Sequence, residues 1–205
     1  MRDVEHAGVR RIALTGGIAT GKSHVRARFE ALGVPTIDSD VLAREAVAFG
    51  TAGLAAVVSR FGQGVLRSDG TLDREALGKI VFADPDARMA LEAIIHPDVR
   101  RAIDEWFVAL DAARDLYAVA DIPLLYEVGR AHDFDAVIVA ACDLDIQVRR
   151  VMKRDGVSEV DARQRIAAQL PIDQKVRRAD YVIRTDGTPD DTDRQVRTVC
   201  ERLRS

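Results

Sequence analysis

The chain has 205 residues, of which 47% are hydrophobic, and a formal net charge of −3 at pH 7. This length suits one α/β domain with appendages, and the scattered basic residues leave no nucleic-acid footprint. No run approaches the roughly 18 apolar residues of a membrane span, and the charged N-terminus lacks a signal-peptide core. We therefore expect a soluble cytoplasmic protein that binds neither nucleic acid nor membrane and has no obligate protein partner.

Two cysteines, Cys142 and Cys200, lie far apart in the sequence. Their spacing matches neither a disulfide framework nor a zinc site. We expect both to be small buried side chains in a reducing compartment.

Short apolar runs alternate with helical stretches along the chain. The candidate strands are Arg11–Thr15, Val34–Ile37, Tyr117–Ala120, Ala136–Ala140 and Tyr181–Ile183. Most lack polar alternation, as strands buried on both faces do, and the helices between them predict βαβ units around a parallel sheet. The final helix is expected from about Thr192 to Arg204.

A phosphate-binding loop follows the first strand. Residues 16–23 read Gly-Gly-Ile-Ala-Thr-Gly-Lys-Ser, the spacing of a P-loop. Its glycines let successive N–H groups point inward at phosphate oxygens, and the next helix adds its positive N-terminal end. Lys22 is expected at the β- and γ-phosphates and the Ser23 hydroxyl at Mg²⁺. Lys22 is one of only four lysines among 30 basic residues, which makes a chance match less plausible.

Two carboxylates end the second strand, in Asp38-Ser39-Asp40. In an extended chain, residues two apart point the same way, so both would face the crevice beside the P-loop. One could accept the proton of an attacking hydroxyl and the other could bind Mg²⁺. The alternative is a pair of helix-capping residues. We select Asp40 as the base.

The long interval from Ser39 to Leu116 carries several helical patterns and one turn at Ser68–Thr71. In an open α/β fold, such an excursion forms a subdomain above the carboxyl ends of the strands, where ligands bind. His96 precedes Pro97 near its end and taken alone is more typical of packing than of catalysis.

An acidic residue, Asp121, ends the third strand and resembles a Walker-B position that helps hold Mg²⁺. A strand-end turn residue is the alternative. The apolar segment Ile122–Glu127 that follows could line a pocket or simply pack.

A second excursion, about Asp145 to Ala179, is rich in arginine. Arginine donors stabilise the charge that develops on a transferring phosphoryl group, and a mobile flap excludes water. We expect two or three of these side chains to touch phosphate and the others to face solvent.

Together these segments resemble the dephospho-CoA kinase family, the last enzymes of coenzyme A biosynthesis, from about Ile12 to Gly187. The resemblance rests on the P-loop, Ile37–Asp40 with Arg44, Asp69–Arg74, Leu91–Pro97, Ile122–Glu127, Arg154-Asp155 and Arg165–Gln169. The ordered combination is specific, whereas a P-loop alone indicates only a superfamily.

The resemblance implies ATP- and Mg²⁺-dependent phosphorylation of the ribose 3′-hydroxyl of dephospho-CoA. It implies a three-layer P-loop kinase fold with a five-stranded parallel sheet, in one domain over 1–205. The core would be about 11–40, 116–148 and 178–205, the helical substrate-binding subdomain about 41–115, and the lid about 149–177.

The resemblance also assigns roles. Asp40, Lys22, Arg154 and Arg165 would be catalytic, and Ser23 and Asp121 would bind the metal. ATP would be bound by Gly16, Gly17, Ala19, Thr20, Gly21, Lys22, Ser23 and His24. Acceptor contacts would come from Asp38, Arg44, His96, Pro123, Leu124 and Leu125.

Several positions depart from the family pattern. The family usually has Gly where Ala19 stands and Ser or Thr where Thr20 stands. It usually has Thr where His24 stands. Ala19 has a Cβ, but it needs no unusual backbone conformation if its φ is negative. Residues 183–187, Ile-Arg-Thr-Asp-Gly, replace a pattern with Asp-Asn before a Gly, which leaves the adenine contacts open. A kinase of another nucleotide or sugar, or a non-catalytic nucleotide switch, are the alternatives; no Asn-Lys-x-Asp segment supports a switch.

Overall fold

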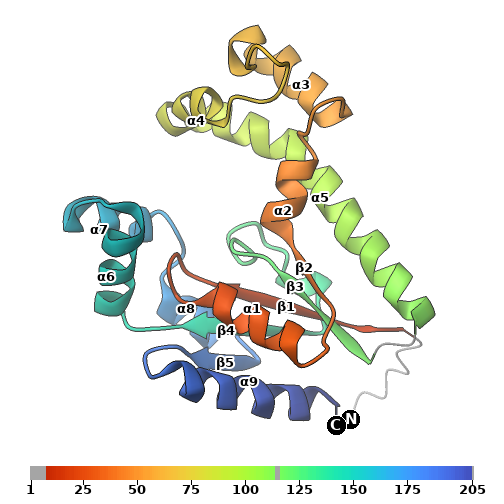
Figure 1. Ribbon diagram of the computed structural model, residues 1–205, viewed down its shortest axis with the longest axis vertical. Coiled ribbons are helices and arrows are strands. Elements are labelled where there is room, and N and C mark those ends of the chain that lie inside the picture. The colour runs from red at the N-terminus through yellow and green to blue at the C-terminus, as the bar shows by residue number, and fades with distance from the viewer. Residues whose placement is uncertain (1–7, 114–115, 205) are drawn as a thin grey trace. The chain divides into compact units, whose positions relative to one another are not determined.

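The computed structural model describes residues 8–113 and 116–204 (Figure 1). They form two compact units. Unit 1 comprises the described residues up to Ile37 and from Phe107 on, and unit 2 is Asp38–Trp106.

A five-stranded sheet in the order β2-β3-β1-β4-β5 forms the centre of unit 1 (Figure 1). The strands are β1 (Arg10–Gly16), β2 (Thr36–Asp38), β3 (Tyr117–Asp121), β4 (Ala136–Ala141) and β5 (Tyr181–Arg184). β1 pairs in parallel with β3 and β4, and β4 with β5. The predicted α/β fold with a parallel sheet is confirmed, although β2 begins two residues later than expected.

Helices α1 (Lys22–Ala31) and α9 (Pro189–Arg204) lie side by side against the sheet. Phe29 of α1 and Leu203 of α9 pack with Ile12 and Ile138 in the main apolar cluster. α9 begins three residues before the expected Thr192 because the Thr188 hydroxyl accepts a hydrogen bond from the N–H of Asp191. Cys142 and Cys200 are buried free thiols, as predicted.

Three further helices follow β4 in unit 1: α6 (Leu144–Asp155), α7 (Glu159–Ala167) and α8 (Ile172–Arg177). α6 and α7 pack on each other through Val148, Val151 and Ala162. Ser158 caps α7 by accepting a hydrogen bond from the N–H of Asp161.

Unit 2 is helical. It contains α2 (Ser39–Glu45), α3 (Ala52–Phe61), a short 3-10 helix η1 (Gln63–Val65), α4 (Arg74–Ala83) and most of α5 (Pro85–Ala113). Val57, Val65 and Leu77 lie in its own apolar cluster. Asp84 and Pro85 start α5, with the Asp84 carboxylate accepting a hydrogen bond from the N–H of Asp86.

Candidate active site

The P-loop connects β1 to α1, so its backbone runs from a buried strand into the first turn of a helix. Gly21, directly before α1, has φ 82°, a left-handed conformation that favours glycine. A Cβ at Gly16 would lie 2.7 Å from the backbone carbonyl oxygen of Ala140, so glycine is required there by close packing. The loop therefore has the backbone freedom and the helix N-terminus that phosphate binding needs.

Ala19 has a φ of 58°, so the condition under which its Cβ would need no unusual backbone is not met. The left-handed turn is imposed by the loop path, and the alanine Cβ adopts it at a cost of about 1–2 kcal/mol. Ala19 is the only non-glycine residue with positive φ in the described part of the chain. The strain thus lies within the predicted ATP-binding loop.

Lys22 and Asp121 form an ion pair at the start of α1 and the end of β3. The Asp121 side chain is 1% exposed, and a carboxylate oxygen also lies 3.7 Å from Nε of Arg26. A buried carboxylate stays charged at low cost only when it is paired in this way. The structure therefore brings together the predicted phosphate-binding lysine and the predicted Walker-B aspartate.

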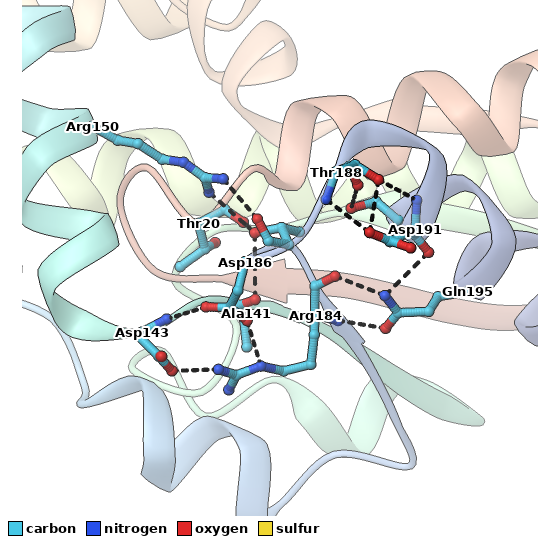
Figure 2. A network of polar contacts seen from close by, with 11 residues as sticks. Thr20, Ala141, Asp143, Arg150, Arg184, Asp186, Thr188, Asp191 and Gln195 are labelled. Atoms are coloured by element: carbon cyan, nitrogen blue, oxygen red, sulfur yellow. Dashed lines mark hydrogen bonds and ion pairs between the residues drawn. The ribbon is translucent and has the colours of Figure 1, made fainter.

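The second half of the P-loop is held by Thr185, which follows β5 (Figure 2). The Thr185 hydroxyl donates to the carbonyl of Thr20 at 2.7 Å, although the two residues are 165 positions apart. Arg150 of α6 donates to the Thr185 hydroxyl at 3.1 Å and to its carbonyl at 2.7 Å. Arg150, one arginine of the predicted flap, thus lies against protein groups beside the loop.

The loops after β4 and β5 are tied together beside Thr185 (Figure 2). Arg184 pairs with Asp143 and donates to Asp186 at 2.7 Å, while Asp186 accepts from the N–H of Asp143 at 2.6 Å. Gln195 of α9 bonds both backbone groups of Arg184. Residues 184–186, which depart from the family pattern, therefore have a structural role: their side chains connect the loops at this edge of the sheet.

Arg154 and Arg165, the two flap arginines selected from the resemblance, both bind Asp155. Nε of Arg154 lies 2.6 Å and NH1 of Arg165 lies 2.7 Å from its carboxylate oxygens. The hydrogen bond from Arg154, with a further contribution from Arg165, lowers the pKa of Asp155. Both guanidinium groups are about half exposed and meet at one carboxylate.

In unit 2, Asp38 caps α2 by accepting a hydrogen bond from the N–H of Asp40 at 2.8 Å. The strand ends at Asp38, and Asp40 lies in the first helical turn. The expectation that both carboxylates share one face of a strand is therefore wrong, because the chain turns into a helix between them. Asp40, Arg44 and His96 are all exposed.

The segment after β3 has a mixed environment. Leu125 is fully buried, Leu124 is 39% exposed, and the Pro123 carbonyl accepts a hydrogen bond from the Thr15 hydroxyl at 3.0 Å. Leu125 thus contributes to the core, and Leu124 offers an apolar surface.

Sequence reasoning did not select Thr185, Gln147, Gln169 or Lys175, which all contact the P-loop backbone. The scarcity of lysine was the available signal for Lys175. Gln169 ends the Arg165–Gln169 segment of the resemblance, whereas Thr185 and Gln147 meet the loop from distant parts of the chain without such a signal.

No helix in the described ranges is long and apolar enough to cross a membrane. No group of three or more acidic, histidine or cysteine side chains suited to a metal occurs among those residues either.

Comparison with known proteins gives consistent matches over most of the chain. The family profile described as dephospho-CoA kinase matches residues 10–191. A dephospho-CoA kinase of Anaeromyxobacter dehalogenans is 52% identical over 182 residues, which are 89% of this chain and 86% of that protein.

Two solved structures share the fold. The protein TT1252 from Thermus thermophilus superposes with a TM-score of 0.80 at 35% identity, over 96% of this chain and 98% of that one. The dephospho-CoA kinase from Campylobacter jejuni has a TM-score of 0.72 at 28% identity, over 94% and 96% of the two chains.

Proposed function

The chain belongs to the dephospho-CoA kinase family, and from that membership we propose how its residues divide the work of phosphoryl transfer. It is an ATP-dependent kinase that phosphorylates dephospho-CoA in coenzyme A biosynthesis. The acceptor ribose 3′-hydroxyl attacks the γ-phosphorus of ATP, an O–P bond forms, and the bond from that phosphorus to the leaving ADP oxygen breaks.

The P-loop holds the ATP phosphates. The observation that carries this assignment is the ion pair between Lys22 and Asp121 at the P-loop. In the same loop, Gly21 adopts a left-handed conformation directly before the N-terminus of α1. Backbone N–H groups of residues 19–23 bind the β-phosphate, and Lys22 places its charge at the β- and γ-oxygens. Gly16 and Gly17 give the chain its path into this cradle.

Ser23 and Asp121 would hold Mg²⁺. They offer a hydroxyl and a carboxylate oxygen, the hard ligands that this cation prefers. Mg²⁺ supplies neutralisation of charge on the phosphate oxygens during transfer. The Asp121 carboxylate ends β3 at the P-loop, where it pairs with Lys22 and lies near Arg26.

Arg154 and Arg165 bind the transferring phosphoryl group. Their support is that both are half-exposed cations on adjoining helices, held by one exchangeable carboxylate. A guanidinium donates hydrogen bonds in a planar fork that fits phosphate oxygens. On binding both substrates, the arginines would leave Asp155 for the phosphate.

Asp40 accepts the proton of the attacking hydroxyl, and Asp38 orients Asp40. Asp38 caps α2 through the Asp40 N–H, which fixes the backbone of Asp40, while the Asp40 residue itself is exposed and able to reach substrate. Arg44, His96, Pro123, Leu124 and Leu125 remain the predicted acceptor contacts. The cytoplasmic location and the boundaries of the core, the substrate-binding subdomain and the lid also remain predictions.

The test replaces each carboxylate by its amide. Asp40→Asn keeps the shape but removes the proton acceptor, so kcat should fall by about 10²–10⁴-fold with little change in ADP affinity. Asp38→Asn keeps a capping oxygen and should have a smaller effect on kcat. A severe Asp38→Asn together with a mild Asp40→Asn would show that the base is misassigned.

A second test addresses the acceptor. Binding energy from remote parts of a large acceptor is used to place its hydroxyl in line with the γ-phosphate, so truncated acceptors lose kcat as well as affinity. We expect kcat/KM for dephospho-CoA to exceed that for adenosine and AMP by a wide margin. Comparable values for the three would mean that unit 2 is not an acceptor-binding surface.

A further inference from the structure

Lys175 of α8 is fully buried, and its ammonium lies directly beneath the P-loop. It donates to the carbonyl of Gly16 at 3.1 Å and to the carbonyl of Pro123 at 3.0 Å. Its third partner is the carboxylate of Glu127 at 2.8 Å. An ammonium has three N–H donors, so these three contacts use all of them.

Desolvating the Lys175 ammonium costs free energy, and packing alone does not account for a charged side chain at this position. Burial lowers the pKa of Lys175, and the bond to Glu127 opposes that shift. A methionine would fill a similar volume without desolvating a charge. The ammonium therefore contributes something that an apolar side chain cannot, namely donors for the carbonyl of the first P-loop glycine.

Ile18, two residues further along the loop, is also fixed by side chains from distant positions. Its N–H donates to Oε1 of Gln169 at 2.7 Å, and its carbonyl accepts from Nε2 of Gln147 at 2.7 Å. The Ile18 side chain packs against the apolar cluster that joins α6 to α7. Both polar backbone groups and the side chain of this loop residue are thus occupied by protein.

Gln169 and Lys175 belong to one short segment, residues 169–175, which leads from α7 into α8. Between them, the N–H of Leu170 donates at 3.0 Å to Glu127, the same carboxylate that pairs with Lys175. The segment is therefore attached at three points to the P-loop and to the chain after β3. Gln169 holds Ile18, and Lys175 holds Gly16.

We propose that Lys175 and Gln169 are positioning residues for the P-loop, which they hold at Gly16 and Ile18 so that the N–H groups of residues 19–23 converge before ATP arrives. They touch no substrate and act through the loop backbone. The inference rests on the proposed placement of the ATP phosphates on this loop. It predicts that both side chains affect nucleotide binding, and that Lys175, which also holds the predicted acceptor residue Pro123, affects acceptor binding less.

The test compares Lys175→Met and Gln169→Leu with matched exposed controls, Lys79→Met and Gln174→Leu. ADP binding is titrated by calorimetry in the presence of Mg²⁺, and KM is measured separately for ATP and dephospho-CoA. Each of the two variants should raise the ADP Kd and the ATP KM by about tenfold, the scale of one lost hydrogen bond to a charged or buried group. The dephospho-CoA KM should stay within about twofold for Gln169→Leu and rise less than the ATP KM for Lys175→Met, and the controls should match wild type.

A purely structural role gives a different result. It would lower the active fraction, and hence kcat, while leaving both KM values and the ADP Kd unchanged; that outcome overturns the proposal. Should Lys175→Met not fold, Lys175→Met/Glu127→Gln removes the carboxylate left without its partner, and the same titration is decisive on that variant.

Lys22→Ala in the same titration separates this proposal from the one it rests on. If Lys22→Ala weakens ADP binding while Lys175→Met and Gln169→Leu do not, only the positioning role is wrong. If none of the three weakens it, the placement of phosphates on the loop is wrong as well.

Discussion

The P-loop and the arginine-bearing helices α6 and α7 both pair cations with carboxylates, but at different depths. At the P-loop, the side chains of Lys22, Asp121 and Lys175 are 14%, 1% and 0% exposed. On the helices, Arg154 and Arg165 are 56% and 49% exposed. Exposed ion pairs contribute about 0–1 kcal/mol, whereas breaking a buried pair costs about 3–5 kcal/mol. The loop is thus set before ATP binds, and the arginines can change partners.

The charge state of Asp155 supports this contrast. Arg154, first, and Arg165 lower its pKa, so the carboxylate remains ionised at neutral pH and its pairing is lost only as pH falls through the lowered pKa. Protonation therefore cannot release the arginines near neutrality. A competing anion, which is the transferring phosphate in the proposed mechanism, can instead displace the carboxylate because the exposed pairs are weak.

The largest expected effect comes from the loop itself. Lys22→Ala removes a preorganised charge at the β- and γ-phosphates, and turnover should fall by at least about 10²-fold in a steady-state assay. Lys79→Ala, an exposed lysine in unit 2, is the matched control and should leave turnover unchanged. Because Lys22→Ala also leaves Asp121 with less compensation, urea unfolding of the variant separates lost function from lost folding. Wild-type turnover in folded Lys22→Ala would refute the P-loop assignment.

A smaller loss of kcat is expected for variants of the exposed arginines on α6 and α7. Arg154→Ala and Arg165→Ala should each lower kcat by about 10- to 100-fold, the scale of one charge-assisted hydrogen bond. Neither should reduce the unfolding free energy by more than about 1 kcal/mol, as exposed pairs contribute little. Arg163→Ala removes an exposed arginine that pairs with Glu159 and serves as the control.

Hydrogen exchange provides an independent measurement of the same contrast. Amide exchange over about 149–169 should slow when a non-hydrolysable ATP analogue and dephospho-CoA are added together, because the arginines then gain phosphate partners. Equal exchange with and without ligands would indicate that α6 and α7 form a rigid structural pair and would remove the contrast with the P-loop.

Thr185→Val tests the buried contacts of the P-loop through the free energy of unfolding. It removes the hydroxyl that donates to the Thr20 carbonyl and accepts from Arg150, with little change in shape. The free energy of unfolding should fall by about 1–3 kcal/mol, the cost of leaving buried polar groups without a partner. Thr198→Val, at an exposed helical threonine, should change it by less than about 0.5 kcal/mol. Equal stability of the two variants in urea unfolding would show that Thr185 does not anchor the loop.

The smallest effect is a gain. Ala19→Gly relieves a left-handed alanine, and the unfolding free energy should rise by up to about 1 kcal/mol after the added chain entropy of glycine is subtracted. Ala27→Gly, in the middle of α1, provides the opposite sign, with a loss of about 0.5–1 kcal/mol. A loss at both positions would mean that the left-handed conformation of Ala19 carries no strain.

Local sequence determined much of this protein. Apolar runs of strand length placed the five strands of the parallel sheet, and the spacing in residues 16–23 identified the P-loop. Capping by Asp84 and Ser158 was also readable, because each cap is made with a residue two or three positions away. These features depend on interactions within a short window, where residue type and spacing decide the outcome.

Tertiary structure decided how the loop is held. The contacts of Ile18 with Gln169, of Thr20 with Thr185 and of Gly16 with Lys175 join residues 151, 165 and 159 positions apart. The positive φ of Ala19 follows from the path of the loop, and the turn into α2 after Asp38 changed where Asp40 lies. No short window contains both partners of such contacts. They form only when the topology of the sheet brings the segment after α7 and the turn after β5 against the same loop.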